Sequence, residues 1–409
     1  MLLKLAWRNL WRQKRRTILT SSALVLALFL SLLTRTLQEG TYAANIENSA
    51  RFYTGLIQIQ HPEYEDSLSI DDVIAQKGET FQIIKKHANV KTVLPRIESF
   101  ALAAAGDKSK GVMVLGVQPY EENRYSGISK KLVKGEFLSA NDRQILIGEG
   151  VANYFGLDVG DEMVLYGQGY RGQTAAGLYP VKGILKYPLP QLDNQLVYLP
   201  LSLAQELYST GENITAWVLH TEDLKELDNT VSELRQRFDK ALNVRDWESL
   251  APEMAQQIMM DKAGGVFMIY VLYGVVGFGL FATIMMMTLE RQREFAVMLA
   301  TGLLRSRLVF LVVIESAFIA VIGVVIGMLV SAPVLAYLYF NPIRFTGETA
   351  QMMLDSGFEP IMPVSLAPLL FFEQIYAVLF ILLLCLIYPL IRIYRLNLVS
   401  ALKGGAHAR

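Results

Sequence analysis

The sequence predicts an α-helical membrane protein with four transmembrane helices and one large extracytoplasmic α+β domain. A span needs about 20 consecutive apolar residues, and apolar runs occupy 18–33, 266–289, 308–339 and 371–391. Between the first two runs, residues 38–265 alternate short strand-like and helix-like patterns. Charged residues make up 19% of the chain, below the roughly 25% of an average soluble protein. The predicted fold class rests on these three observations.

Basic residues near the spans set the predicted orientation. They form three groups: Lys4, Arg8, Arg12, Lys14, Arg15 and Arg16; Arg291, Arg293, Arg305 and Arg307; and Arg392, Arg395, Lys403 and Arg409. With four spans, all three groups lie on one side of the membrane. Lys and Arg flanking spans are enriched on the cytoplasmic side, so we expect a multi-pass protein with both termini in the cytoplasm.

The predicted domain boundaries follow from the apolar runs. The first run continues through 34–38 without a small-x-small cleavage site, which favours a retained anchor over a signal peptide. The predicted order is a cytoplasmic amphipathic helix at 1–16, a first span at 17–37, an extracytoplasmic domain at 38–265 with a β-rich lobe at about 120–195, a second span at 266–289, a cytoplasmic helix at 290–307, a third span at 308–340, an outer loop at 341–370, a fourth span at 371–391 and a cytoplasmic tail at 392–409.

The N-terminal helix combines basic residues with Trp7 and Trp11. This composition suits an anionic membrane surface. Simple anchoring and a docking role both remain open for it, and membrane lipid is one expected partner.

The extracytoplasmic domain is acidic and free of cysteine. Residues 38–265 hold 22 Lys and Arg against 31 Asp and Glu, a net charge of −9. Such a balance argues against nucleic acid or anionic headgroups as its partner. The single cysteine, Cys385, lies in the fourth apolar run, so no disulfide forms within the chain.

Alternating residues predict the strands of the outer domain. Residues 56–60 read as one strand, and 101–105 with 111–116 read as a hairpin. A helix is expected at 224–238, and a second at 248–262 that continues into the second span. Two stiff helical connections would then join the domain to the membrane.

The charged segment between the second and third spans is too short to be a domain. Glu290 and Glu294 suit the first turns of a helix, and Gly302 suits its end. Phe295, Met298 and Leu299 fall on one apolar stripe. Such a stripe can insert into a groove of another protein or lie on lipid headgroups, and the pattern alone leaves both open.

Residues 167–172 match the G-x-G-x-x-G dinucleotide pattern, with Asp193 about 20 residues further on. The pattern requires a following helix, but 174–180 does not have a helical sequence. We therefore predict a hairpin tip, which is a candidate for contacts with a periplasmic partner. Its residues are Gly167, Gly169, Tyr170, Arg171 and Gly172.

Four glycines in the spans predict close helix packing, either within one subunit or across a dimer. They are Gly274, Gly277, Gly323 and Gly327. Glu315 lies about two turns inside the third span, where a charge is costly and indicates a functional site by default.

Catalytic motifs are missing from the sequence. It has no G-x-x-x-x-G-K-[ST] segment, so this chain is not expected to hydrolyse ATP. His61, His87, His220 and His407 are far apart and lack metal-ligand spacing. We therefore predict no catalytic residue, no metal and no cofactor in this chain.

Three segments together resemble the FtsX/MacB/LolC–LolE superfamily of type VII ABC permeases. They are residues 5–20, the segment from Glu290 to Gly302, and residues 388–403. In that superfamily the middle segment is the coupling helix that docks on a cytoplasmic ATPase. Met298 and Leu299 stand where those families usually carry a basic residue, so Arg291, Arg293, Arg305 or Arg307 could supply the polar contact.

The resemblance implies the function and the partners. The ATPase-coupling residues would be Glu290, Arg291, Arg293, Glu294, Phe295, Met298, Leu299 and Gly302. Glu315 would make a structural bond between helices near the inner face, and residues 38–265 would form a porter-like βαβ lobe with the inserted β-rich lobe.

The chain would be a permease subunit in a bacterial inner membrane, coupled to a dimer of separate ATPases that bind ATP and Mg. A second copy or a related permease would complete the transporter, and a periplasmic carrier protein would receive the cargo. We expect extraction of a lipoprotein or another lipid-bearing cargo from the outer leaflet. The alternatives are MacB-like efflux of peptides or drugs and FtsX-like regulation of a cell-wall hydrolase.

Overall fold

A computed structural model describes residues 2–12, 14–187, 190–355 and 360–396. The chain divides into two compact units. The helical unit comprises Met1–Thr41, Met259–Ile343 and Met362–Arg409, and the second unit comprises Tyr42–Ile258 and Arg344–Ile361. Of the predicted cytoplasmic tail, residues 397–409 lie outside the described part of the chain.

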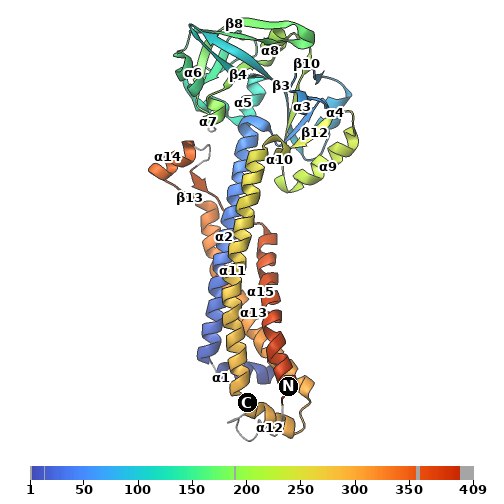
Figure 1. Cartoon of the computed structure of the whole chain (residues 1–409), viewed down its shortest axis with the longest axis vertical. Coiled ribbons are helices and arrows are strands. Elements are labelled where there is room, and N and C mark those ends of the chain that lie inside the picture. The colour runs from blue at the N-terminus through green and yellow to red at the C-terminus, as the bar shows by residue number, and fades with distance from the viewer. Residues whose placement is uncertain (1, 13, 188–189, 356–359, 397–409) are drawn as a thin grey trace. The chain divides into compact units, whose positions relative to one another are not determined.

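The helical unit is built from long helices that run alongside one another (Figure 1). Among the described residues, four helices are long and apolar enough to cross a membrane. The helices with residues in this unit are α1 (Leu2–Arg12), α2 (Lys14–Ser49), α11 (Pro252–Glu290), α12 (Gln292–Ala300), α13 (Arg305–Phe340) and α15 (Pro368–Tyr394). The second predicted connection starts later than expected: α10 (Trp247–Leu250) is a separate turn, and α11 begins at Pro252, a residue suited to a first helical turn.

Glycines let helices of this bundle approach closely. A Cβ atom at Gly323 would lie 2.8 Å from Leu24 of α2, and one at Gly327 would lie 2.6 Å from Leu28. The pair therefore packs α13 against α2 within one chain. Gly277 likewise packs against Ile381 of α15, at 2.9 Å. Gly274 makes no such close helix contact within the chain, because a Cβ atom at this position would have no atom within 4 Å.

A polar chain crosses the interior of the bundle. The hydroxyls of Ser31 and Tyr273 are 2.9 Å apart, and Tyr273 also donates a hydrogen bond of 2.7 Å to Gln374. All three side chains are buried. Their hydrogen bonds link α2, α11 and α15. Each buried polar side chain thereby gains a hydrogen-bond partner, which polar groups away from water require.

The second unit is an α+β domain built around one ten-stranded sheet. Its strands run in the order β12-β1-β11-β3-β4-β9-β6-β8-β5, with β7 paired to β3 and β8. Their bounds are β1 (Ile57–Gln60), β3 (Val90–Ala105), β4 (Lys108–Val117), β5 (Leu132–Gly135), β6 (Ile145–Gly148), β7 (Glu162–Gln168), β8 (Thr174–Leu185), β9 (Leu196–Pro200), β11 (Ala216–Thr221) and β12 (Asn243–Asp246). The remaining strands are β2 (Ile74–Ala75), β10 (Asn213–Ile214), β13 (Ile343–Arg344) and β14 (Ile361–Met362).

Short helices connect these strands. They are η1 (Ala50–Thr54), α3 (Tyr64–Ser67), α4 (Glu79–Lys85), α5 (Pro119–Ser126), η2 (Ile128–Lys131), α6 (Glu149–Phe155), η3 (Tyr170–Gly172), α7 (Pro190–Asp193), α8 (Leu201–Tyr208), η4 (Leu224–Glu226), α9 (Leu227–Phe238) and α14 (Glu348–Asp355). The predicted hairpin is formed by β3 and β4, which pair antiparallel from Ile97 opposite Gly116 to Ala105 opposite Lys108.

The long strand β3 joins the two halves of the sheet. Its first half pairs with β11, and its second half pairs with β4 and β7. Residues 120–195, expected as a β-rich lobe, supply β5 to β8, and β6 continues the sheet through β9. Two pairings are parallel, β4 with β9 and β6 with β8.

Both faces of the central strands are buried. Along β4, Val112 and Val114 belong to one apolar core, while Leu115 and Val117 belong to another. In β9, Val197 and Tyr198 divide in the same way. Because successive strand residues point to opposite faces, a sheet covered on both sides reads as a continuous apolar run, which is the pattern of residues 111–117 and 196–199.

Candidate functional site

The candidate site is the elbow between α11 and α13, which we define as residues 290–304. The helix α11 ends at Glu290, and α12 (Gln292–Ala300) follows after Arg291. The helix ends where the Gly302 backbone takes a φ of +97°, which glycine adopts without the steric cost that other residues meet. Backbone hydrogen bonds from Gly302 to Leu299 and from Leu303 to Met298 close the turn.

A buried ion pair fastens the elbow to the third long helix. Arg291 Nη1 donates to Glu315 Oε2 over 2.6 Å, and the two residues are 7% and 3% exposed. The other carboxylate oxygen of Glu315 accepts a hydrogen bond of 2.6 Å from Asn9 Nδ2 of α1. Glu315 therefore binds the elbow with one oxygen and the N-terminal helix with the other, which makes it a bond between helices.

A second carboxylate extends this network outward. Glu294 accepts a 3.1 Å bond from Arg291 Nε and a 2.8 Å bond from Arg12 Nη2. Partial burial alone would raise the pKa of Glu294, but the hydrogen bonds and charges of Arg291 and Arg12 outweigh it and lower the pKa. We call the five residues Asn9, Glu315, Arg291, Glu294 and Arg12 the elbow network.

The apolar stripe of α12 faces the interior of the chain. Phe295 is 1% exposed and packs in a cluster with Ala6, Leu308, Leu311 and Ile393. The ring of Phe295 also lies 5.1 Å from the guanidinium carbon of Arg291, close enough for a cation–π contact.

The predicted partner-facing role of Phe295 therefore needs correction. Its stripe is covered by helices α1, α13 and α15 of the same chain. Met298 and Leu299 are half-buried against the same cluster.

The outward face of α12 is formed by other residues. Arg293, Val297 and Ala300 are exposed and follow one another at intervals of four and three, so they share a face. Val297 is 49% exposed, and Leu304 after the helix is 60% exposed. We call Arg293, Val297, Ala300 and Leu304 the outward face. Glu290 and Gly302 are also exposed.

Sequence reasoning missed the two partners from α1. Asn9 and Arg12 read only as part of a basic amphipathic helix, and 306 positions separate Asn9 from Glu315. The charge of Glu315 inside an apolar run signalled that a partner exists, but nothing in the sequence specified which one.

Comparison with known proteins assigns the family. Residues 17–237, more than half of the chain, match the MacB-like periplasmic core domain. Residues 266–398 match the FtsX-like permease C-terminal domain. The chain belongs to the FtsX/MacB/LolC–LolE superfamily of ABC transporter permeases. Members of this superfamily are transmembrane subunits of ABC transporters. Four helices long and apolar enough to cross a membrane, together with the match to a MacB-like periplasmic core, indicate a multi-pass protein of the inner membrane.

Two curated relatives are described as transmembrane proteins of lipoprotein-releasing systems. The permease is 22% identical over 269 residues to the lipoprotein-releasing system transmembrane protein LolC of Neisseria meningitidis, covering 63% of this chain and 64% of the relative. It is 23% identical over 226 residues to the corresponding LolE protein of Haemophilus influenzae, covering 54% of each. The permease thus matches somewhat more than half the length of these relatives.

A solved structure is also similar. The periplasmic region of MacB from Actinobacillus actinomycetemcomitans aligns with a TM-score of 0.34 and 15% identity, over 52% of the permease and 97% of that chain.

The G-x-G-x-x-G segment of the permease forms a hairpin. Strands β7 and β8 pair antiparallel up to Gln168 opposite Thr174, and residues Tyr170–Gly172 form a single turn. Arg171, with a φ of 54°, stacks on Tyr170, with 5.0 Å between the guanidinium carbon and the ring centroid. A strand follows instead of a helix, so this segment lacks the helix N-terminus that would hold a pyrophosphate.

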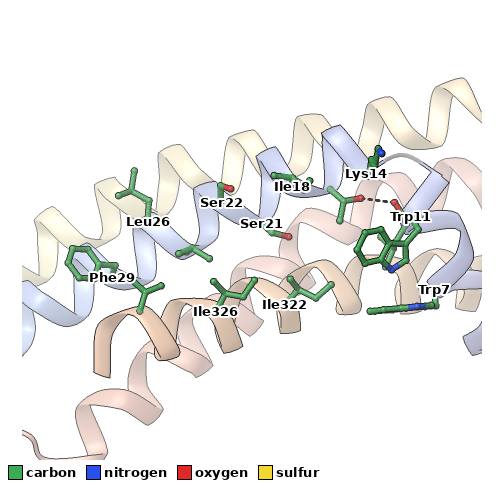
Figure 2. A pocket seen from close by; sticks show the side chains of 14 residues that line it. Trp7, Trp11, Lys14, Ile18, Ser21, Ser22, Leu26, Phe29, Ile322 and Ile326 are labelled. Carbon is green, nitrogen blue, oxygen red and sulfur yellow. Dashed lines mark hydrogen bonds between the residues drawn. The ribbon is translucent and has the colours of Figure 1, made fainter. Parts of the chain in front are cut away.

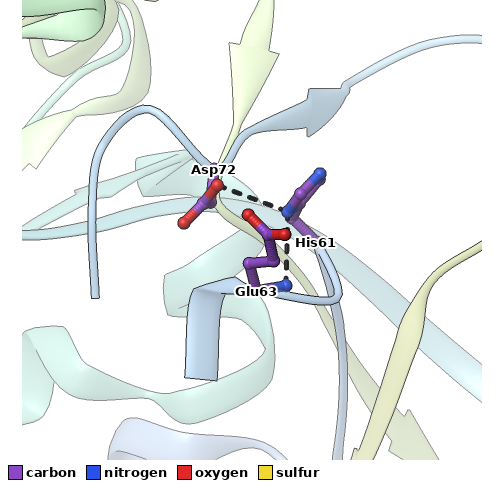
Figure 3. Close-up of side chains that lie close together, drawn as sticks. All are labelled: His61, Glu63 and Asp72. Carbon is purple, nitrogen blue, oxygen red and sulfur yellow. Dashed lines mark hydrogen bonds and ion pairs between the residues drawn. The ribbon is translucent and has the colours of Figure 1, made fainter. Parts of the chain in front are cut away.

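One histidine of the permease is less isolated than its sequence suggested. His61 lies beside Glu63 and Asp72, with one candidate ligand atom from each within 4.8 Å of the others (Figure 3). The Nδ1 atom of His61 is 3.4 Å from Asp72 Oδ1 and accepts a 3.3 Å hydrogen bond from the Glu63 backbone. Sequence spacing hid Asp72 because a loop and a short helix separate it from His61.

Proposed function

We propose that the chain is the permease subunit of an ATP-driven mechanotransmission transporter that extracts lipoprotein or other lipid-bearing cargo from the outer leaflet of a bacterial inner membrane. The observation that carries this proposal is the buried Arg291–Glu315 pair. It ties α12 to α13, so a force on the outward face would move both helices together.

The elbow network supports the mechanical step. Asn9 and Arg12 connect α1 to the same carboxylates that hold the elbow, so α1, α12 and α13 form one block near a membrane surface. The helices α2 and α11 are each continuous over 36 and 39 residues. At 1.5 Å per residue, each is over 50 Å long, well beyond the roughly 30 Å of the hydrocarbon core. Such helices can carry displacement past the membrane.

The outward face is the proposed docking surface for the ATPase. Arg293 supplies a cation, while Val297 and Leu304 supply exposed apolar area. A dimer of cytoplasmic ATPases would bind ATP and Mg and close on this surface, with both termini of the permease in the cytoplasm. A second copy or a related permease would occupy the other half of the transporter, and a periplasmic carrier protein would receive the cargo.

The cargo class rests on the relatives. The LolC and LolE proteins are named for lipoprotein release, and a lipid-bearing substrate suits a transporter that works from the outer leaflet. A second candidate is MacB-like efflux of peptides or drugs, which the match of residues 17–237 to the MacB-like core favours. FtsX-like regulation of a cell-wall hydrolase fits less well because residues 38–265 form a large outer domain.

Co-purification and ATPase stimulation test the proposal. The chain is purified in mild detergent from its own cells, and the ATPase rate is measured with triacylated lipoprotein, with a peptide drug and with a cell-wall hydrolase. The proposal predicts a bound ATPase that only lipoprotein stimulates. Stimulation of the ATPase by the drug alone or by the hydrolase alone would contradict the proposed lipid-bearing cargo. If no ATPase co-purifies, the proposal that the chain is a transporter subunit is wrong.

A further inference from the structure

An apolar groove of about 550 Å³ runs along the helical unit between α2 and α13 (Figure 2). Its walls include Ile18, Leu26 and Phe29 of α2, and Ile322 and Ile326 of α13. The volume lies within the range of sites that hold a small molecule, roughly 300–1,000 Å³. None of its lining residues belongs to the elbow network or to the outward face.

Two tryptophans of α1 line one end of the groove. Trp7 packs edge-on against Phe318 of α13, with 5.7 Å between ring centroids, and against Trp11, with 6.1 Å. Trp7 and Trp11 nevertheless stay 46% and 61% exposed. Their rings are therefore held in place while still offering surface to a ligand, as tryptophans do at membrane–water interfaces.

Charge is confined to this same end. Among the side chains that the structure describes, Lys14 is the only charged one that lines the groove, and none of the ion pairs between them involves Lys14. Along α2, Lys14 and Phe29 are 15 residues apart, which is about 22 Å at the helical rise. The groove is thus long and apolar, with a tryptophan pair and one unpaired cation at one end.

We propose that this groove binds one acyl chain of an anionic phospholipid, with the headgroup phosphate at Lys14. The occupant must be apolar along its length and anionic at one end, and a bilayer lipid has both properties. A basic residue near an anionic leaflet contributes attraction of this kind.

A helix from a second copy fits the groove less well. Helix–helix interfaces in membranes are rich in small residues that allow close approach, and the small pair of α13, Gly323 and Gly327, is already used against α2 of the same chain. Large apolar side chains make up most of the groove wall, where the small residues are Thr17, Ser21 and Ser22. A packed apolar helix would also leave the cation of Lys14 without a partner.

Tryptophan quenching by brominated lipids tests the proposal on the full chain in detergent. Brominated-acyl phosphatidylglycerol and phosphatidylcholine are titrated separately. We expect phosphatidylglycerol to bind about fivefold more tightly, the factor for one basic residue at an anionic surface. Lys14→Gln should remove that preference. Arg15→Gln, which changes a neighbouring exposed cation outside the groove, should keep it.

A second pair of variants tests the acyl chain. Ser22→Phe fills the groove and should weaken quenching by both lipids severalfold, whereas Ala23→Phe, exposed on α2 but outside the groove, should not. Equal quenching by the two lipids, equal losses in Lys14→Gln and Arg15→Gln, or unchanged quenching in Ser22→Phe would each overturn the proposal. Efficient cross-linking of a Ser22→Cys variant between copies in vesicles would assign the groove to a second permease instead.

Discussion

Arg291 and Glu315 meet over 2.6 Å in the interior of the helical unit, joining the elbow to α13. A buried pair of this kind adds little stability compared with apolar residues of the same shape, but breaking it leaves one charge unpaired. The pair therefore constrains where the elbow sits more than it stabilises the bundle. This is the property that a force-transmitting joint needs.

Breaking the pair should destabilise the helical unit. Glu315→Leu leaves Arg291 without its buried partner, and the expected cost is about 3–5 kcal/mol. The double variant Arg291→Leu with Glu315→Leu should recover most of it, because no unpaired charge remains. Thermal unfolding of the detergent-purified protein measures both. A double variant as unstable as the single one would contradict the assignment of the cost to unpaired charge.

The outward face should be needed for ATPase binding and not for folding. Val297→Asp puts a charge on an exposed position, so the protein should fold normally but co-purify with much less ATPase. Val159→Asp is the matched control, because Val159 is 42% exposed and lies in the extracytoplasmic unit. Undiminished ATPase recovery with Val297→Asp would remove the outward face from the docking surface.

Phe295 should behave as a core residue. Phe295→Ala removes a side chain that is 1% exposed, and deletions of this size cost about 3–5 kcal/mol. We therefore expect lower thermal stability together with any loss of ATPase binding, unlike the selective loss in Val297→Asp. A Phe295→Ala protein with unchanged melting temperature but no bound ATPase would restore Phe295 to the docking surface.

His220 should make the extracytoplasmic domain sensitive to acid. Burial, followed by the charges of Arg96 and Arg51, holds its pKa well below 6.5. The unfolded chain takes up a proton near pH 6.5 while the folded chain does not, so stability falls as pH drops below about 6.5, by up to about 1.4 kcal/mol per pH unit. His220→Phe should flatten this dependence and keep the stacking on Tyr125.

Hydrogen exchange of β11 between pH 7 and pH 5 measures this effect, after correction for the intrinsic exchange rate. His87→Gln serves as the control, because His87 lies nearer the surface beside Glu233 and its replacement should leave the acid response in place. An acid response of the same size in His220→Phe and in the wild-type chain would show that another group causes it.

Local sequence pattern was enough for most elements but not for the site's contacts. The strand at 56–60 and the hairpin of 101–105 with 111–116 followed from alternating residues, and the hairpin at 167–172 followed from the lack of a helical sequence after it. The orientation of the α12 stripe could not be predicted, because it depends on where α1 packs. An apolar stripe on a short helix can pack against the same chain or against another protein, and its sequence is the same in both cases. Asn9 likewise contacts Glu315 only because the fold brings together residues that are far apart in the sequence.

ATP-dependent release of a fluorescent lipoprotein from proteoliposomes tests the proposed transport function most directly. The vesicles contain the permease, the ATPase and any partner permease that co-purifies with them. We expect release with ATP, no release with a non-hydrolysable analogue, and loss of release in Val297→Asp but not in Val159→Asp. Lipoprotein that stays in the membrane while the wild-type complex hydrolyses ATP, or release that proceeds equally in Val297→Asp, would contradict it.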